Sequence, residues 1–239
     1  MSWAILRQLV LASRHAVADG ERLAAQLRLP AGFADPELAA IDVADYVMPV
    51  GPQKFLEVVG PLSDRAYLLG WLDKVGGAGG YCLSVQVPDV AACAERAAAL
   101  GIRVPVDTVV MGHRLLQLHP ADTGILLELD GIADPAQWYW DEVSPGPRAD
   151  AVIDDIVAVQ VGVPDPERAS AQWAELIGLT PTSPTELDFS GCRVEFVERT
   201  PGQLIGATFR LASGAEVPPL GTALDMSFQY VTAEENANA

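Results

Sequence analysis

The sequence has few cysteines and no long hydrophobic run. Its three cysteines, Cys82, Cys93 and Cys192, are widely spaced and form no CxxC motif. A disulfide framework or a structural zinc cluster is therefore not expected. No stretch reaches the roughly 18 uncharged apolar residues that a membrane-spanning helix needs. The apolar run near the start is interrupted by Arg7 and Gln8, which is not typical of a secretory signal. A reduced, cytoplasmic protein is expected.

Basic residues are also scarce. The 239 residues include 15 Lys and Arg against 32 Asp and Glu, which gives a net charge of −17 at pH 7. A nucleic-acid partner needs a basic face, and an anionic membrane surface attracts basic residues, so neither partner is expected. Half of the residues are apolar, which is enough to form a packed core. The composition therefore indicates a folded acidic protein.

Two segments of the chain resemble each other. The run 83–89 and the run 157–165 are both β-rich and both end in Pro-Asp. Each is followed by a predicted helix, over 90–100 and 166–177, with Asp at the N-cap and Gly just past the end. The strand-like run 6–12 and the helical run 19–27 form a third, weaker copy at the N-terminus. The chain is therefore built from repeats.

Strand-like segments follow each predicted helix. In the first repeat they cover 39–50, expected as two strands, and 54–59; in the second 103–110, 113–118 and 125–129; in the third 186–189 and 193–197. Each repeat thus reads β-α-β-β-β, with the third one compressed, which indicates an α+β fold. The glycine-rich run 76–80 is expected to be a flexible connection. A last strand over 204–211 is expected to open a truncated fourth repeat.

Composition also predicts domain boundaries. Residues 1–133 would hold two paired βαβββ units, at 5–62 and 80–131, and residues 134–151 would form a linker. Residues 152–232 would form a third, degenerate unit. The linker carries three aromatic residues, 138–140. They are expected to pack against the N-terminal pair, with a ligand-binding role as the alternative.

One stretch carries a family resemblance. Residues 116–129 combine His119-Pro120, Gly124 and a final Leu-Glu-Leu, and residues 55–59 resemble the matching strand of the first repeat. The pattern is similar to the vicinal oxygen chelate superfamily, which includes glyoxalase I, methylmalonyl-CoA epimerase, extradiol dioxygenases and bleomycin-resistance proteins. The resemblance covers residues 5–131 and extends to 199 through the repeats. It implies that paired repeats curl into cup-shaped mixed sheets.

The same resemblance implies a metal site. Its ligands would come from the first and last strands of the paired repeats, which places Gln8, Glu57, Cys82 and Glu128 in one cup. Such a set suggests a divalent ion: Mn, Mg, Ni, Co, Fe or Zn. Glu57 and Glu128 would be the catalytic residues, one of them moving a proton beside a carbonyl. The sequence departs from the family pattern because neither first-strand position is His, and a thiol at Cys82 suits an oxygen-rich site poorly.

Structural alternatives stand beside these roles. Because neighbours alternate across a strand, Glu57 and Glu128 could also face solvent. His113 and His119 lie at either end of one predicted strand and are candidates to bind substrate at the mouth of the cup. A hydrogen bond within the turn that follows is the alternative for His119.

The resemblance implies a glyoxalase-like protein that acts on a small carbonyl-type metabolite as a metal-dependent isomerase, epimerase or lyase. The alternative is a metal-free, bleomycin-resistance-like protein that binds a small molecule without catalysis. A purely structural protein is a third option. The third repeat would dock on the same chain or build a homodimer.

Overall fold

The structure is a computed structural model that describes residues 2–35, 37–146 and 148–237, so Pro147 of the predicted linker lies outside it. In chain order the elements are β1 (Ile5–Ser13), α1 (Ala16–Leu27), η1 (Leu38–Ile41), β2 (Val43–Val50), β3 (Lys54–Pro61), α2 (Leu69–Lys74), β4 (Ala78–Val87), α3 (Val90–Ala99), β5 (Val106–Val110), β6 (His113–Leu118), α4 (Pro120–Thr123), β7 (Leu126–Gly131), β8 (Ile153–Val163), α5 (Pro166–Ile177), β9 (Glu186–Asp188), β10 (Arg193–Glu198), β11 (Gln203–Leu211), β12 (Thr222–Ala223), β13 (Met226–Val231) and α6 (Ala233–Ala237).

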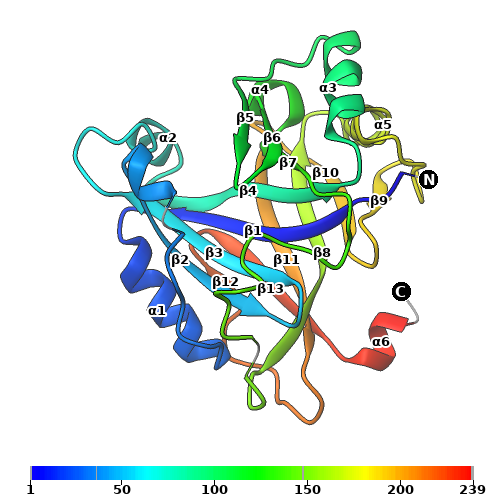
Figure 1. Cartoon of the computed structure of the whole chain (residues 1–239). Coiled ribbons are helices and arrows are strands. Elements are labelled where there is room, and N and C mark those ends of the chain that lie inside the picture. The colour runs from blue at the N-terminus through cyan, green and yellow to red at the C-terminus, as the bar shows by residue number, and fades with distance from the viewer. Residues whose placement is uncertain (1, 36, 147, 238–239) are drawn as a thin grey trace. The chain divides into compact units, whose positions relative to one another are not determined.

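The strands pair in a way that repeats along the chain (Figure 1). The first strand of each repeat lies parallel to its last strand, in the pairs β1–β3, β4–β7 and β8–β10. The last strand is in turn antiparallel to the strand that precedes it, in the pairs β2–β3, β6–β7 and β9–β10. The predicted α+β fold built from repeats is therefore confirmed. The second repeat has the full βαβββ order, whereas the first and the third have one strand fewer.

A fourth, truncated repeat is also present. β11 lies parallel to β13, and β13 is antiparallel to β12, which is the same relation as in the first three repeats. A loop replaces the helix between β11 and β12. The strand predicted over 204–211 is thus the first strand of this repeat.

The predicted helix ends are confirmed in α3 and α5. The side chain of Asp89 accepts a hydrogen bond from the backbone N–H of Ala92, and Asp165 accepts one from that of Arg168. Pro166 occupies the first turn of α5, and Gly178 ends this helix in the left-handed region, with φ of 85°. None of the described helices is of a length and hydrophobicity that could cross a membrane.

Two local predictions were wrong. The segment 39–50 holds one strand, β2, preceded by the short 3-10 helix η1, because the chain turns at Asp42 with a positive φ of 64°. The glycine-rich run 76–80 is only partly a connection, because β4 already begins at Ala78. Backbone pairing in the sheet can order Gly79 and Gly80 despite their intrinsic freedom.

The chain forms two compact units, each made of three separate stretches. The 82–142 unit consists of residues 1–7, 82–142 and 158–204, and the 8–81 unit consists of residues 8–81, 143–157 and 205–239. These units combine the repeats differently from the predicted ranges 1–133, 134–151 and 152–232. The predicted domain ranges stay a prediction.

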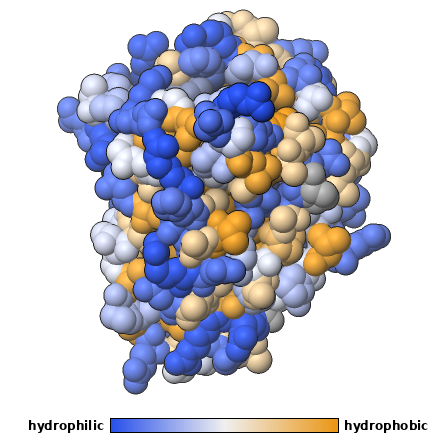
Figure 2. All heavy atoms as spheres, turned by 90° about the vertical axis from the view of Figure 1, so that its left-hand side faces the viewer, coloured by the Kyte–Doolittle hydropathy of each residue, from blue (hydrophilic) through white to orange (hydrophobic). Residues whose placement is uncertain are grey.

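In the 8–81 unit, α1 packs against β2 and β3 (Figure 1). The contact depends on small residues beneath the ring of Tyr46. A Cβ atom added at Gly20 of α1 would lie 2.5 Å from this ring, and one added at Gly32 would lie 2.3 Å from it. Hydrophobic side chains that remain outside such cores lie in scattered groups among hydrophilic ones on the face drawn in Figure 2.

This packing predicts the sign of a substitution. Gly20→Ala should raise helix propensity by about 1 kcal/mol, but the clash with Tyr46 should cost about 1–3 kcal/mol. We therefore expect Gly20→Ala to destabilise the native protein and to stabilise a Tyr46→Ala variant. Urea unfolding of the four proteins of this double-mutant cycle measures the difference. Equal effects of Gly20→Ala in both backgrounds would contradict the packing.

Candidate functional site

The candidate glutamates occupy equivalent positions in three repeats. Opposite Glu57 lies Val10 of β1, opposite Glu128 lies Ser84 of β4, and opposite Glu195 lies Gln160 of β8. The predicted first-strand residues Gln8, Cys82 and Ala158 lie two positions earlier on these strands. Because side chains alternate with a period of two, they share a sheet face with the glutamate of their own repeat.

In the 8–81 unit, this face carries Gln8, Glu57 and a residue that the sequence did not point to, Asp45. Asp45 is opposite Val59 on the adjacent strand pair, two positions from the residue opposite Glu57. Such diagonal neighbours have their Cβ atoms about 7–8 Å apart. All three side chains are buried, with Glu57 only 3% exposed. The solvent-facing alternative for Glu57 therefore does not hold.

Asp45 has the chemistry of a proton acceptor. Its carboxylate accepts a hydrogen bond from the backbone N–H of Asp35, at 2.7 Å. Burial raises the pKa of Asp45 from 3.8 to about 6, and the nearby Asp35 contributes in the same direction. The rings of Phe33 and Phe55, 6.4 Å apart and edge-on, add apolar surroundings to the same strands. A carboxyl group with a pKa near neutrality is a stronger base than an ordinary aspartate.

Gln8 is a further buried polar residue on this face of the sheet. Its side-chain amide makes no hydrogen bond with the residues that the structure describes, although only 7% of the residue is exposed. An amide N–H can donate to a carbonyl oxygen. The face of β1, β2 and β3 thus combines a base at Asp45 with a donor at Gln8.

The corresponding face in the 82–142 unit is closed by the chain itself. Ser84 and Gln86 of β4 and Asp130 of β7 lie on this face and are completely buried. The hydroxyl of Ser84 donates to Asp130 at 2.6 Å, and the hydroxyl of Tyr139 donates to it at 3.1 Å. Burial, together with the negative charge of Glu128, raises the pKa of Asp130 well above its ordinary value.

Arg7 fastens the segment 134–140 over this face. Its guanidinium donates to the side-chain oxygen of Gln86 and to the carbonyl oxygen of Pro135, both at 2.6 Å, and lies 5.4 Å from the ring centre of Trp138. Burial lowers the pKa of Arg7 to about 10. Trp138 and Trp140 are each 4% exposed. These aromatic residues therefore pack against the protein interior, as the sequence predicts.

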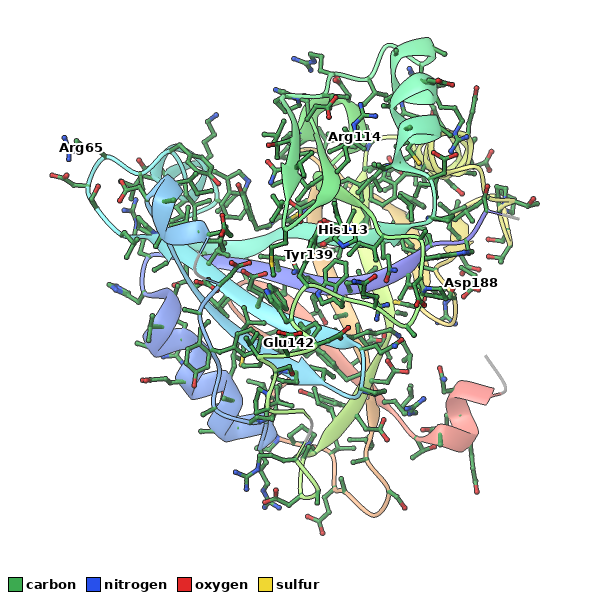
Figure 3. All side chains as sticks on the ribbon, in the orientation of Figure 1. Arg65, His113, Arg114, Tyr139, Glu142 and Asp188 are labelled. Carbon is green, nitrogen blue, oxygen red and sulfur yellow. The ribbon has the colours of Figure 1, made fainter. Side chains whose placement is uncertain are left out.

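The remaining predicted site residues have local partners. Glu128 is half-buried and accepts a hydrogen bond from the side-chain amide of Gln117 at 2.8 Å. His119 accepts the backbone N–H of Ala121 at 3.1 Å, which is the predicted turn hydrogen bond. The ring of His113 meets that of Tyr139 edge-on at 5.8 Å (Figure 3). Cys82 is buried.

A divalent metal does not fit these donors well. Across residues 2–35, 37–146 and 148–237, no three His, Cys, Asp or Glu side chains are grouped in a way that could hold a metal ion. Gln8 and Glu57 belong to one compact unit, and Cys82 and Glu128 belong to the other. The four-ligand set stays a prediction. The chemistry that the structure defines is that of its buried carboxyl groups, Asp45 and Asp130.

Comparison with known proteins gives resemblances among solved structures. No protein-family model and no curated protein matches the chain. Methylmalonyl-CoA epimerase from Mycobacterium tuberculosis is 22% identical, with 52% of this chain and 85% of that chain covered and a TM-score of 0.46. A Streptomyces coelicolor methylmalonyl-CoA epimerase variant is 23% identical, covering 54% and 96%, with a TM-score of 0.47. A hypothetical protein from Bacillus halodurans is 16% identical, covering 56% and 99%, with a TM-score of 0.48.

These likenesses cover about half of this chain and concern its fold. Methylmalonyl-CoA epimerase is a member of the vicinal oxygen chelate superfamily. The solved structures that resemble this chain thus include members of the superfamily whose pattern the sequence motifs resemble. The function of this chain therefore has to be derived from its own side chains.

The pKa of Asp45 predicts a pH dependence of stability. Folding raises this pKa from 3.8 to about 6, so the folded state holds the proton more tightly than the unfolded chain. The resulting stabilisation is complete below about pH 3.8 and is lost as the pH rises through about 6. Between pH 4 and pH 7, the native protein should lose up to about 3 kcal/mol relative to Asp45→Asn.

Urea unfolding at both pH values measures this difference. Asp188→Asn, which changes an exposed carboxylate on β9, is the control and should follow the native protein. Parallel pH curves for the native protein and Asp45→Asn would contradict the assignment.

Proposed function

We propose that this protein is a glyoxalase-like isomerase or epimerase that moves a proton at the carbon beside the carbonyl of a small metabolite. The observation that carries the proposal is the buried carboxyl group of Asp45, whose pKa of about 6 lies near neutral pH. A base of this strength can remove a weakly acidic C–H proton when it is held against the substrate. Asp45 is thus assigned as the proton acceptor.

Gln8 has a separate role. It lies opposite Phe55, four positions along β3 from Val59, the residue opposite Asp45, and on the other side of β3. A rise of about 3.3 Å per residue and a spacing of about 4.8 Å between strands put the two backbones about 16 Å apart, so one carbonyl group cannot contact both side chains. The side-chain amide of Gln8 has no partner among the described residues and is assigned to a polar group at the far end of the substrate. Return of the proton from Asp45 to the same or a neighbouring carbon completes an isomerisation and regenerates the base.

Glu57 shares the face but has a different part in the proposal. It is one of the two predicted catalytic residues and lies diagonally from both Gln8 and Asp45. We assign it to the binding surface of the substrate and Asp45 to the proton transfer.

Asp130 is not assigned to catalysis. It is completely buried, and the hydroxyls that donate hydrogen bonds to it, those of Ser84 and Tyr139, belong to the chain itself. A sealed carboxyl group can hold a proton but cannot exchange it with a substrate without movement of residues 134–140.

The second candidate function is a metal-free protein that binds a small molecule without catalysis. The two candidates differ in one observable. A binder shifts the resonances of its ligand without exchanging the ligand's protons, whereas the proposed enzyme exchanges them with solvent.

We expect exchange of the proton beside the carbonyl in deuterated water. The assay is proton NMR on hemithioacetals of 2-oxoaldehydes, 2-hydroxyketones and branched acyl thioesters, with EDTA present. Asp45→Asn should lower the exchange rate at least about 100-fold, because the base is removed and the shape is kept. Glu21→Gln, on the exposed side of α1 in the same unit, should not change the rate. Binding without exchange would leave only the second candidate.

Asp35 offers an independent check on the same base. Its charge helps to raise the pKa of Asp45, while the hydrogen bond to Asp45 comes from its backbone and survives substitution. Asp35→Asn should therefore move the acid limb of the exchange rate to lower pH. An acid limb that stays in place, measured from pH 4 to pH 8, would argue against Asp45 as the base.

A further inference from the structure

An open cavity of about 610 Å³ lies in the 82–142 unit, where the end of α3, the short helix α4 and the start of α5 meet. Its volume is typical of sites that bind small molecules. The lining comes from residues 100–102, 120–124, 163–165, 168–169, 172 and 201–202. No residue proposed for proton transfer is among them.

The wall of this cavity is held rigidly. The indole N–H of Trp173 on α5 donates to the carbonyl oxygen of Thr123 at 3.1 Å, which ties α5 to the loop 120–124. A Cβ atom at Gly202 would lie 2.5 Å from the carbonyl oxygen of Gly124, so the backbones of these two lining residues are in close contact. A preformed wall lowers the entropy cost of binding a ligand.

The acidic groups of the lining already have partners. Asp122 accepts hydrogen bonds from the guanidinium of Arg103 at 2.7 and 2.8 Å, and this bonding lowers the pKa of Asp122 to about 2. Asp165 caps α5 through the backbone N–H of Arg168. Asp122 is thus paired with a cation, whereas Asp165 keeps its negative charge while it caps α5.

The basic and amide groups of the lining have no such partners. Arg168 and Gln172 are one turn apart on α5, and both line the cavity. Among the described residues, neither side chain makes a hydrogen bond or an ion pair. Most other lining residues are apolar, including Leu100, Ile102 and Val163. The cavity therefore offers unused donors beside an apolar wall.

We propose that this cavity binds a small carboxylate with an apolar body. The guanidinium of Arg168 pairs with the carboxylate, and the amide of Gln172 donates a second hydrogen bond. A single negative charge matches the one unpaired cation. A doubly charged phosphate would be repelled by the carboxylates of Asp122 and Asp165, which line the same space. The proposal does not depend on the proton chemistry of Asp45, which belongs to the other compact unit.

The test uses octanoate as the probe and the full-length chain labelled with nitrogen-15. The backbone amides of Gly101, Gly124 and Gly202 line the cavity and report binding, and that of Gly20 on α1, in the other compact unit, serves as the reference. We expect saturable shifts of the three lining glycines with octanoate. Octan-1-ol, which lacks the charge for a charge-assisted hydrogen bond, should bind at least about tenfold more weakly. Octyl phosphate should also bind at least about tenfold more weakly, because its second charge is repelled by Asp122 and Asp165.

Variants identify the donor. Arg168→Gln changes an exposed residue and should weaken octanoate binding about tenfold. Arg65→Gln makes the same change of charge at another arginine whose guanidinium has no partner among the described residues, and should leave binding unchanged. The proposal is overturned by octanoate that gives no saturable shift, by equal binding of octan-1-ol or octyl phosphate, or by Arg168→Gln that binds like the native protein.

Discussion

Parallel pairing between the first and the last strand of each repeat determines where the polar side chains of this protein lie. Once β1 pairs with β3 and β4 with β7 in their observed register, every second residue faces the helix and the others face the opposite side. The helix side takes the apolar residues, such as Leu56 and Leu127. The opposite side receives Gln8, Glu57 and Asp45 in one unit, and Ser84 and Asp130 in the other. The chemistry follows from this register.

The same register creates two different kinds of carboxyl group. Among the described residues, neither Asp45 nor Asp130 forms an ion pair with a basic side chain, so burial dominates and the pKa rises in both. The surroundings of the two carboxyl groups then give them different roles. Asp130 is sealed beneath Tyr139 and held by hydroxyl donors, which suits a structural anchor for residues 134–140. Asp45 accepts a hydrogen bond from the backbone N–H of Asp35 and keeps a little exposure, which suits exchange of a proton with a ligand.

Local patterns predicted much of this arrangement. The helices over 90–99 and 166–177 follow from Asp caps and closing glycines, because these signals act within a few residues. The recurrence of Glu57, Glu128 and Glu195 was visible because the repeats preserve spacing. The residues opposite these glutamates, Val10, Ser84 and Gln160, could not be predicted, since register is fixed by contacts between strands that are distant in sequence. Asp45 gave no sequence signal at all, because an aspartate in the run 43–50 reads equally well as a solvated residue.

Because basic residues are scarce in this chain, a basic side chain that has no acidic partner is a candidate to bind a ligand. In a chain of net charge −17, acidic partners are abundant, and most of the described arginines are taken by a carboxylate or a carbonyl oxygen. Arg103 is an example, because it is neutralised by Asp122 at the edge of the 610 Å³ cavity. Arg168 lines the same cavity and stays without a partner, although Asp165 is only three residues away and is held as a helix cap. The carboxylate of Asp165 thus caps the backbone of α5, and the guanidinium of Arg168, which lines the cavity without an ion pair among the described residues, is available to a ligand.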